Sequence, residues 1–354
     1  MAVSFQHLVY PFSAIVGQSE LKLALLLNAI NPRIGGLLVR GQKGTGKSTT
    51  VRALVDILPD ITVVKGCPFN CSPTDPTNMC PDCMEKYQAG KDTKAERRKM
   101  GIVSLPIGAT EDRVIGSLDI EKAIGRGIRA LQPGLLAEAN QNILYIDEVN
   151  LLPDHITDSI LDAAASGWNI VEREGVSVAH PSRFILIGTM NPEEGELRPQ
   201  LADRFALHIS VEGIYDEEQR VEIIRRNLEF GEDPIKFSRQ WFEEQENLRG
   251  QILRAKEMLS AVEIPEWMMR AVASACIRLH LDGHRPDITT VRAARTLSAM
   301  EGQKTVTAEN ILKVANMAVG FRTRGGGFEE PATPAEIRET FADALRRAQA
   351  ETAV

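Results

Sequence analysis

Short apolar runs alternate with helical patterns along the first 213 residues of the chain. The runs at 36–40, 142–147 and 183–189 are mostly apolar, which is typical of parallel strands buried on both faces. Between them, 51–58 and 155–167 repeat apolar residues at helical spacing. Strands that alternate with helices predict an α/β fold, a parallel sheet with helices on both faces.

The rest of the chain has a different texture. Residues 169–180 alternate around Glu174-Gly175, which predicts a β-hairpin. After Gly213 the patterns are mostly helical, so we expect an α/β domain over 1–213 and an all-α domain over 214–354. The expected helices lie at 216–230, 239–262, 266–281, 288–301 and 307–318. The Gly- and Pro-rich stretch after Arg322 predicts a flexible joint, followed by a last polar helix.

A glycine-rich stretch separates the first predicted strand from the next helix. It matches G-x-x-x-x-G-K-[ST] at every position, with Gly41, Gln42, Lys43, Gly44, Thr45, Gly46, Lys47 and Ser48, and Thr49 follows. Backbone N–H groups wrap a triphosphate only where φ takes values that glycine tolerates. We therefore expect Lys47 to reach the β and γ oxygens of ATP and the Ser48 hydroxyl to bind Mg²⁺. The alternative is an ordinary tight turn, and the flanking strand and helix argue against it.

Two carboxylates follow the second predicted strand. Asp147 is expected to hold the Mg²⁺ of MgATP, and Glu148 to orient and activate a water for attack on the γ-phosphate. The alternative is a solvated acidic turn, which fits less well about 100 residues after a phosphate loop.

Further polar residues are candidates for the same site. Asn191 follows the third strand and is expected to contact the γ-phosphate or the attacking water, although asparagine there is usually a turn former. Arg204, in an Asp-Arg-Phe turn, is expected to reach the nucleotide of a neighbouring subunit, the alternative being a surface ion pair with Asp203. In the helical part, Arg285, Arg292 or Arg295 could cover the nucleotide, the alternative for each single arginine being a structural role.

Four of the five cysteines lie close together in the sequence. Cys67, Cys71, Cys80 and Cys83 have the spacing C-x3-C-x8-C-x2-C, in an insert near 66–96. Four cysteines can form a tetrahedral zinc site, and the C-x2-C half suits one. The alternatives are a redox-active disulfide pair and inert thiols on a surface insert.

Composition narrows the class of protein. The chain has 354 residues, 43% of them hydrophobic and 25% charged, and a formal net charge of -7. That balance is typical of a globular protein, and the negative charge argues against a nucleic-acid motor. The first residues lack the pattern of a secretory signal, so the expected location is a reducing compartment. No stretch is apolar for long enough to predict a membrane span.

Together these features resemble the AAA+ ATPases, and longer stretches resemble more narrowly the I-subunit family of magnesium chelatases. These are YPFSAIVGQSELKLALLL (10–27), LPIGATEDRVIGSLDIEKAI (105–124), LQPGLLAEANQNILYIDEVNLL (131–152) and GTMNPEEGELRPQLADRF (188–205). An insert near 105–135 and the hairpin at 169–180 resemble the extra elements of the helix-2-insert branch.

The resemblance implies a function and roles for single residues. The family uses ATP and Mg²⁺, forms a ring that is typically hexameric, and works with a D subunit and a porphyrin-binding H subunit. Together they insert Mg²⁺ into protoporphyrin IX, the activity of a ligase that forms nitrogen–metal bonds. By motif, Asn191 would be sensor 1, Arg204 the finger acting in trans, and Arg285 sensor 2, preferred to Arg292 because it precedes the helix in similar members.

The resemblance also implies that a chain with the cysteine cluster is the chlorophyll-pathway form of an oxygenic phototroph, and the expected location is then a cyanobacterial cytoplasm or a plastid stroma. A MoxR-type chaperone ATPase for metalloproteins is the main alternative. It shares the phosphate loop and the insert but generally lacks the stretches at 110–124 and 131–140 in this form.

Overall fold

The computed structural model describes residues 9–91, 93–118, 131–173, 176–195 and 197–352. They form two compact units, and each is treated by itself below. The first unit comprises Met1–Asn31, Val39–Leu58 and His208–Val354, and the second comprises Pro32–Leu38 and Pro59–Leu207. The sequence-based division at residue 213 stays a prediction.

Five strands form the main sheet, in the order β11-β1-β10-β7-β4. Their bounds are β1 Leu37–Gly41, β4 Ile102–Leu105, β7 Ile143–Ile146, β10 Ile185–Met190 and β11 Leu207–Val211. Both β10 and β4 pair in parallel with β7, with Ile185 and Ile102 opposite Ile143. Every residue of β7 and β10 is buried, as expected for strands covered on both faces. The α/β fold class and the three predicted strands are confirmed, whereas β4 and β11 were not predicted.

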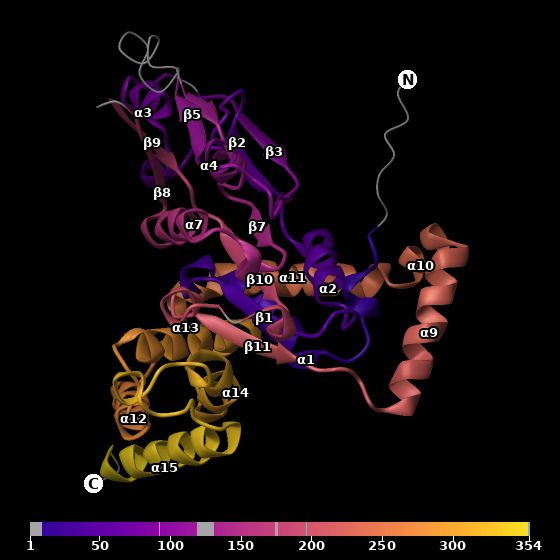
Figure 1. Cartoon of the computed structure of the whole chain (residues 1–354), viewed down its shortest axis with the longest axis vertical. Coiled ribbons are helices and arrows are strands. Elements are labelled where there is room, and N and C mark those ends of the chain that lie inside the picture. The colour runs from indigo at the N-terminus through magenta and orange to yellow at the C-terminus, as the bar shows by residue number, and fades with distance from the viewer. Residues whose placement is uncertain (1–8, 92, 119–130, 174–175, 196, 353–354) are drawn as a thin grey trace. The chain divides into compact units, whose positions relative to one another are not determined.

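The second unit adds three antiparallel strand pairs to its part of the sheet (Figure 1). The pairs are β2 Ile61–Val64 with β3 Ala95–Arg98, β5 Gly116–Leu118 with β6 Leu131–Pro133, and β8 Trp168–Arg173 with β9 Val176–Pro181. The last pair confirms the predicted hairpin, whose Glu174-Gly175 tip lies outside the described residues, as do residues 119–130 of the predicted insert. The helices of this unit are α3 Pro81–Gln88, α4 Glu111–Ile115, α6 Leu135–Glu138, α7 Asp154–Ser166 and α8 Pro199–Ala202.

An apolar core of the second unit surrounds β7 and β10. Leu144 and Ile146 of β7 and Leu186 of β10 belong to it, and α7 contributes Ile156 and Ile160. This helix confirms the prediction at 155–167 and ends at Gly167, whose φ of 76° is the left-handed conformation that glycine adopts cheaply after a helix. The carboxyl ends of β7 and β10 are thus fixed by a packed core.

The first unit is mostly helical. Its helices are α1 Ser19–Ile30, α2 Lys47–Ala53, α9 Glu217–Glu232, α10 Pro234–Gln240, α11 Phe242–Met258, α12 Glu266–Arg278, α13 Arg285–Met300, α14 Ala308–Val319 and α15 Pro334–Thr352. The predicted helices are confirmed with one correction: the pattern at 239–262 is α11 alone, and the separate α10 precedes it. A capping box begins α14, in which the Thr307 N–H donates to Asn310 Oδ1 at 2.9 Å and the Asn310 N–H to Thr307 Oγ1 at 3.3 Å.

The segment after Arg322 differs from the flexible joint that its composition predicts. The Arg324 guanidinium donates to the Leu279 carbonyl at 2.7 Å and to Glu336 Oε1 at 2.9 Å, which ties the segment to α12 and α15. The last helix is also not merely polar, because Ile337 and Phe341 are buried in it. The prediction was wrong because local composition does not show a long-range ion pair.

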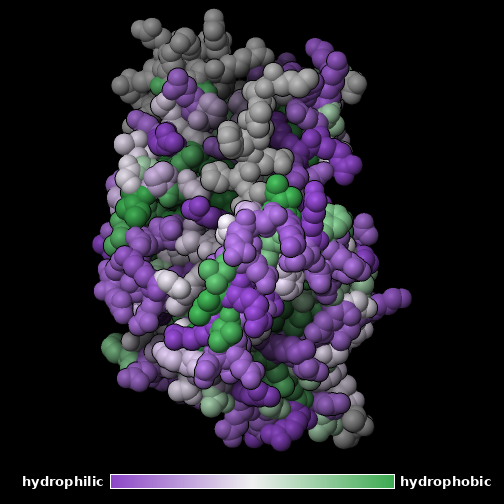
Figure 2. All heavy atoms as spheres, turned by 90° about the vertical axis from the view of Figure 1, so that its right-hand side faces the viewer, coloured by the Kyte–Doolittle hydropathy of each residue, from purple (hydrophilic) through white to green (hydrophobic). Residues whose placement is uncertain are grey.

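Helix α9 has no fully buried side and carries hydrophobic residues on an exposed side. None of its 16 residues is buried, and Val221, Ile224 and Leu228 are exposed at spacings of three and four residues. Figure 2 faces the side on which α9 lies in Figure 1 and shows a row of hydrophobic side chains among polar ones. No helix in the described part of the chain has the length and apolar character needed to cross a membrane.

Candidate nucleotide site

The predicted phosphate loop has the backbone that its glycines suggested. Gly44 and Gly46 both have a φ of 80°, in the left-handed region, and α2 begins at Lys47 as predicted. A side chain at Gly41 would collide with the carbonyl oxygen of Val211, so that glycine is required for space as well. The loop therefore has the conformation in which successive backbone N–H groups can point at an anion.

The Lys47 side chain folds over this loop. Its ammonium donates to the carbonyls of Gly41 and Gln42 at 2.5 and 2.7 Å. The Thr45 hydroxyl donates to the Gln42 carbonyl at 2.9 Å and closes the loop on itself. A cation held over a ring of backbone groups fits the terminal phosphates of a nucleotide.

A residue that the sequence did not single out holds the loop in place. The Gln18 amide donates to the Thr45 carbonyl, and Gln18 Oε1 accepts from the Thr50 hydroxyl at 3.0 Å. Gln18 thus joins the loop to the first turns of α2. It lies in the IVGQ segment before α1, which carried the family resemblance but no chemical signal.

The acidic end of β7 is in the second unit, where hydroxyl groups orient it. Asp147 directly follows β7, as predicted, and its Oδ1 accepts from Thr189 Oγ1 at 2.5 Å and from the Tyr145 hydroxyl at 2.9 Å. Both bonds use Oδ1, so Oδ2 has no hydrogen-bond partner among the described residues. A fixed carboxylate with one oxygen unengaged fits a Mg²⁺ ligand, directly or through water.

Glu148 has a backbone conformation that is rare for a residue with a Cβ. Its φ and ψ are 55° and 56°, the left-handed region, where its N–H donates to Thr189 Oγ1 at 3.3 Å. Such strain costs on the order of 1 kcal/mol or more and collects at functional sites. The conformation turns the chain sharply after β7 and gives Glu148 a direction different from that of Asp147.

The remaining candidates of this unit have local partners. Asn191 directly follows β10 and is buried. Its Oδ1 accepts from the Glu193 N–H at 3.3 Å, so the side chain also stabilises a turn, as the alternative interpretation expected. Arg204 pairs with Asp162 of α7, and the proposed ion pair with Asp203 is therefore not the one formed. This ion pair within one chain does not test whether Arg204 reaches the nucleotide of a neighbouring subunit, and that role stays a prediction.

Arg285 lies in the first unit and its side chain is exposed. It was predicted to lie just before the helix, but it is the first residue of α13. A cation there is unfavourable to the helix dipole by about 0.3–1 kcal/mol, so helix stability does not explain it. Arg292, also exposed, is two turns further along α13. The choice between them as sensor 2 stays a prediction.

The four clustered cysteines also meet in space. Their sulfur atoms all lie within 4.8 Å of one another, and all four thiols are free. His180 of β9 stacks on Phe69, which lies between Cys67 and Cys71. Burial lowers the pKa of the His180 imidazole, because desolvation disfavours its charged form.

Comparisons with known proteins agree with this architecture. The model of the AAA domain matches residues 34–194, and that of the AAA lid domain matches residues 269–341. A parallel sheet with a phosphate loop after β1, an acidic residue pair after β7 and a helical lid define the class of AAA ATPases.

Close relatives narrow the class to a family. The magnesium-chelatase subunit ChlI homolog of Methanocaldococcus jannaschii is 57% identical over 323 residues, which cover 91% of this chain and 88% of that one. The chloroplastic magnesium-chelatase subunit ChlI of Oryza sativa subsp. japonica is 53% identical, over 90% of this chain and 77% of its own. The ChlI subunit of Nostoc sp. is 47% identical, over 96% and 91%. The chain belongs to the family of magnesium-chelatase I subunits.

Two solved structures are also similar to this chain. A cryo-EM-based structure of the complex between subunits BchI and BchD of magnesium chelatase matches with a TM-score of 0.53 and 46% identity, over 94% of this chain and 99% of that one. A putative ATPase from Cytophaga hutchinsonii matches with a TM-score of 0.59 at 16% identity, which shows the shared fold alone.

Proposed function

We propose that this chain is the ATP-hydrolysing motor subunit of a magnesium chelatase, which drives insertion of Mg²⁺ into protoporphyrin IX in chlorophyll biosynthesis. The observation that carries the proposal is that one chain has both an ordered phosphate loop and the oriented carboxylate Asp147, and that its relatives are named magnesium-chelatase I subunits.

We infer that the loop and the carboxylates form one nucleotide site. In the sheet order, β10 lies between β1 and β7, and ligands of parallel sheets bind beyond the carboxyl ends of the strands. Lys47 would then bind the β- and γ-phosphates of ATP, while Ser48 and Asp147 would hold Mg²⁺. The ion, when bound, would offset the negative charge that gathers on the phosphates.

Within such a site, Glu148 would accept the proton of the attacking water, and Asn191 would orient that water or the γ-phosphate. Arg204 would serve the nucleotide of a neighbouring subunit, and Arg285 would cover the nucleotide from the helical domain. These roles require a ring, for which we propose a hexamer. Loss of the γ-phosphate would remove contacts at each subunit boundary and let the subunits shift.

We propose the D subunit as a direct partner, because the BchI relative was solved in a complex with BchD. The porphyrin-binding H subunit would receive the motion and host the chelation. The net charge of -7 does not favour nucleic acid as a further partner. The expected compartment is a cyanobacterial cytoplasm or a plastid stroma.

The test is reconstitution from separate subunits. This chain is mixed with D, H, ATP, Mg²⁺ and protoporphyrin IX, and the metallated product is followed by its absorption. Omission of this chain is expected to abolish product, and Glu148→Gln is expected to bind ATP without sustaining turnover. A Glu148→Gln chain that supports repeated chelation at the parent rate contradicts the proposed coupling.

A further inference from the structure

The clustered cysteines come from two short segments of the second unit. Cys67 and Cys71 lie on the loop after β2, Cys80 is the residue before α3, and Cys83 lies in the first turn of α3. Three of the four are buried and Cys67 is half-buried. Among the residues that the structure describes, no other group of three or more candidate ligands lies close enough to share an ion.

The spacing of the sulfur atoms fits a single metal ion. A tetrahedral site with metal–sulfur bonds of about 2.3 Å has sulfur–sulfur edges of about 3.8 Å. The sulfur atoms of Cys67 and Cys80 are 4.0 Å apart, and all four lie within 4.8 Å of one another. A disulfide needs about 2.05 Å between two sulfurs and leaves the other two without a role. An iron–sulfur cluster places several atoms between its ligands and needs a wider arrangement.

A backbone donor already contacts the cluster. The Cys80 N–H donates to Cys71 Sγ at 3.0 Å. Cys80 and Cys83 stand at the positive end of the eight-residue helix α3. Such N–H groups and a helix N-terminus stabilise sulfur as thiolate, the form that binds metal.

The loop is held in this shape by a buried asparagine. The Asn140 side chain donates to the Phe69 and Asn70 carbonyls at 2.8 and 3.1 Å and to Asn78 Oδ1 at 2.8 Å. These bonds fix the segments that carry Cys67 and Cys80. The ligands are therefore placed by side chains outside the cluster, as metal sites require.

We propose that Cys67, Cys71, Cys80 and Cys83 bind one zinc ion as a closed structural site. Zn²⁺ bonds to four thiolates, and each thiol releases its proton to water on binding. No ligand position remains for water, so the ion has no catalytic role. The site goes beyond the proposed motor function and does not depend on it.

The surroundings show what the ion would stabilise. The cysteines share an apolar cluster with Val171 and Val178 of the β8–β9 hairpin and with Leu131 of β6. A zinc ion would join the end of β2 to the start of α3 beneath that hairpin. It would thus brace the insert, whose β2–β3 and β5–β6 pairs have four and three residues per strand.

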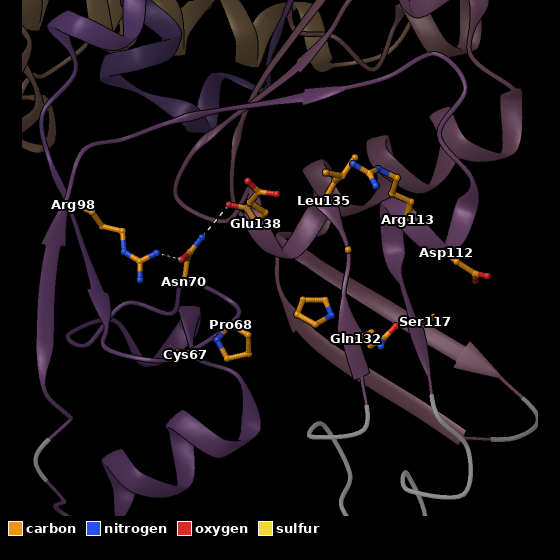
Figure 3. Close-up of a pocket in the computed structure, with 12 residues that line it drawn as sticks. Cys67, Pro68, Asn70, Arg98, Asp112, Arg113, Ser117, Gln132, Leu135 and Glu138 are labelled. Carbon is orange, nitrogen blue, oxygen red and sulfur yellow. Dashed lines mark hydrogen bonds between the residues drawn. The ribbon is translucent and has the colours of Figure 1, made fainter. Parts of the chain in front are cut away.

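The half-buried Cys67 gives the ion a path to the cluster. It lines a pocket of about 560 Å³ in the second unit. Figure 3 shows Arg98 and Asn70 on one side of this pocket and Arg113 and Asp112 on the other.

The test is the metal content of the full chain, purified without chelator and under reducing conditions. We expect inductively coupled plasma mass spectrometry to find about one zinc per chain. This zinc should be released when a mercurial reagent blocks the thiols. Cys71→Ser and Cys83→Ser are each expected to lower zinc at least fivefold. Cys276→Ser is the matched control, because Cys276 is a buried cysteine of α12 in the first unit and is not one of the four clustered cysteines, and it should keep one zinc.

A second measurement covers the case in which the serine variants do not fold. Cobalt is exchanged into the parent chain, and four thiolates should give intense sulfur-to-cobalt charge transfer with tetrahedral visible bands. The proposal is overturned by a parent chain without stoichiometric zinc, by iron in its place, by a Cys67–Cys80 disulfide under reducing conditions, or by equal zinc loss in Cys276→Ser. None of these readouts requires ATP hydrolysis, so failure here leaves the motor function standing.

Discussion

The left-handed backbone of Glu148 makes an unusual stability prediction. With φ and ψ of 55° and 56°, any residue with a Cβ is strained by about 1–2 kcal/mol, and alanine retains that strain. Glycine removes the strain but loses about 0.5–1 kcal/mol more conformational entropy on folding. Glu148→Gly should therefore be more stable than Glu148→Ala by about 1 kcal/mol, whereas both lose the carboxylate.

The assay is thermal unfolding of the nucleotide-free chain, together with steady-state ATP hydrolysis. The difference of about 1 kcal/mol corresponds to about 2 °C in Tm, with Glu148→Gly the higher. Both variants should hydrolyse ATP at least 100-fold more slowly than the parent, because the water lacks its base. Ala165→Gly is the matched control: residue 165 is exposed on α7, where the order reverses and glycine lowers stability by about 0.5–1 kcal/mol.

The reasoning is refuted if Glu148→Ala is as stable as Glu148→Gly or more so, because the strain would then not exist. It is also refuted if either variant hydrolyses ATP at the parent rate. The two failures are separable, since the first concerns the backbone and the second the carboxylate.

Three further predictions test other contacts. Thr189→Val removes the donor to Asp147 and should lower the rate of ATP hydrolysis about tenfold while ATP affinity stays within threefold, a split measured by kinetics and equilibrium binding. Asn140→Ala removes three buried hydrogen bonds and one partly buried hydrogen bond and should destabilise the chain by about 3 kcal/mol in denaturant unfolding. An unchanged unfolding midpoint argues against this network. Arg204→Ala should abolish ATP hydrolysis in the assembled ring while ATP binding is preserved. Asp162→Ala removes only the ion-pair partner of Arg204 and should leave hydrolysis in place. Equal effects of the two variants would assign Arg204 a structural role.

The sequence predicted the parts of the site that depend on local chain geometry. A phosphate loop needs glycines and a lysine at fixed spacing within one short segment, so its residues can be identified from the sequence alone. Asp147 was likewise marked by the apolar strand before it. Thr189 was missed because it reaches Asp147 through the register of β10 on β7, in which Gly188 lies opposite Ile146.

The sequence did not predict contacts between residues that are far apart in the chain. The ion pair with Asp203, which was the alternative to a finger role for Arg204, is not formed, and Arg204 pairs instead with Asp162, 42 residues earlier. The spacing of the four cysteines left zinc, disulfide and inert thiols open. Their convergence depends on Asn140, which is some 60–70 residues from the loops that it holds. The anchoring of the last segment by Arg324 was invisible for the same reason.

The central claim is that the loop containing Lys47 binds the terminal phosphates of ATP. Its most direct test is equilibrium binding of MgATP to Lys47→Ala beside Arg52→Ala, which removes an exposed cation from the same helix. We predict a loss of affinity of at least 100-fold for Lys47→Ala, about 2.7 kcal/mol, and a change within threefold for Arg52→Ala. A Lys47→Ala chain that binds MgATP as tightly as the parent contradicts the account.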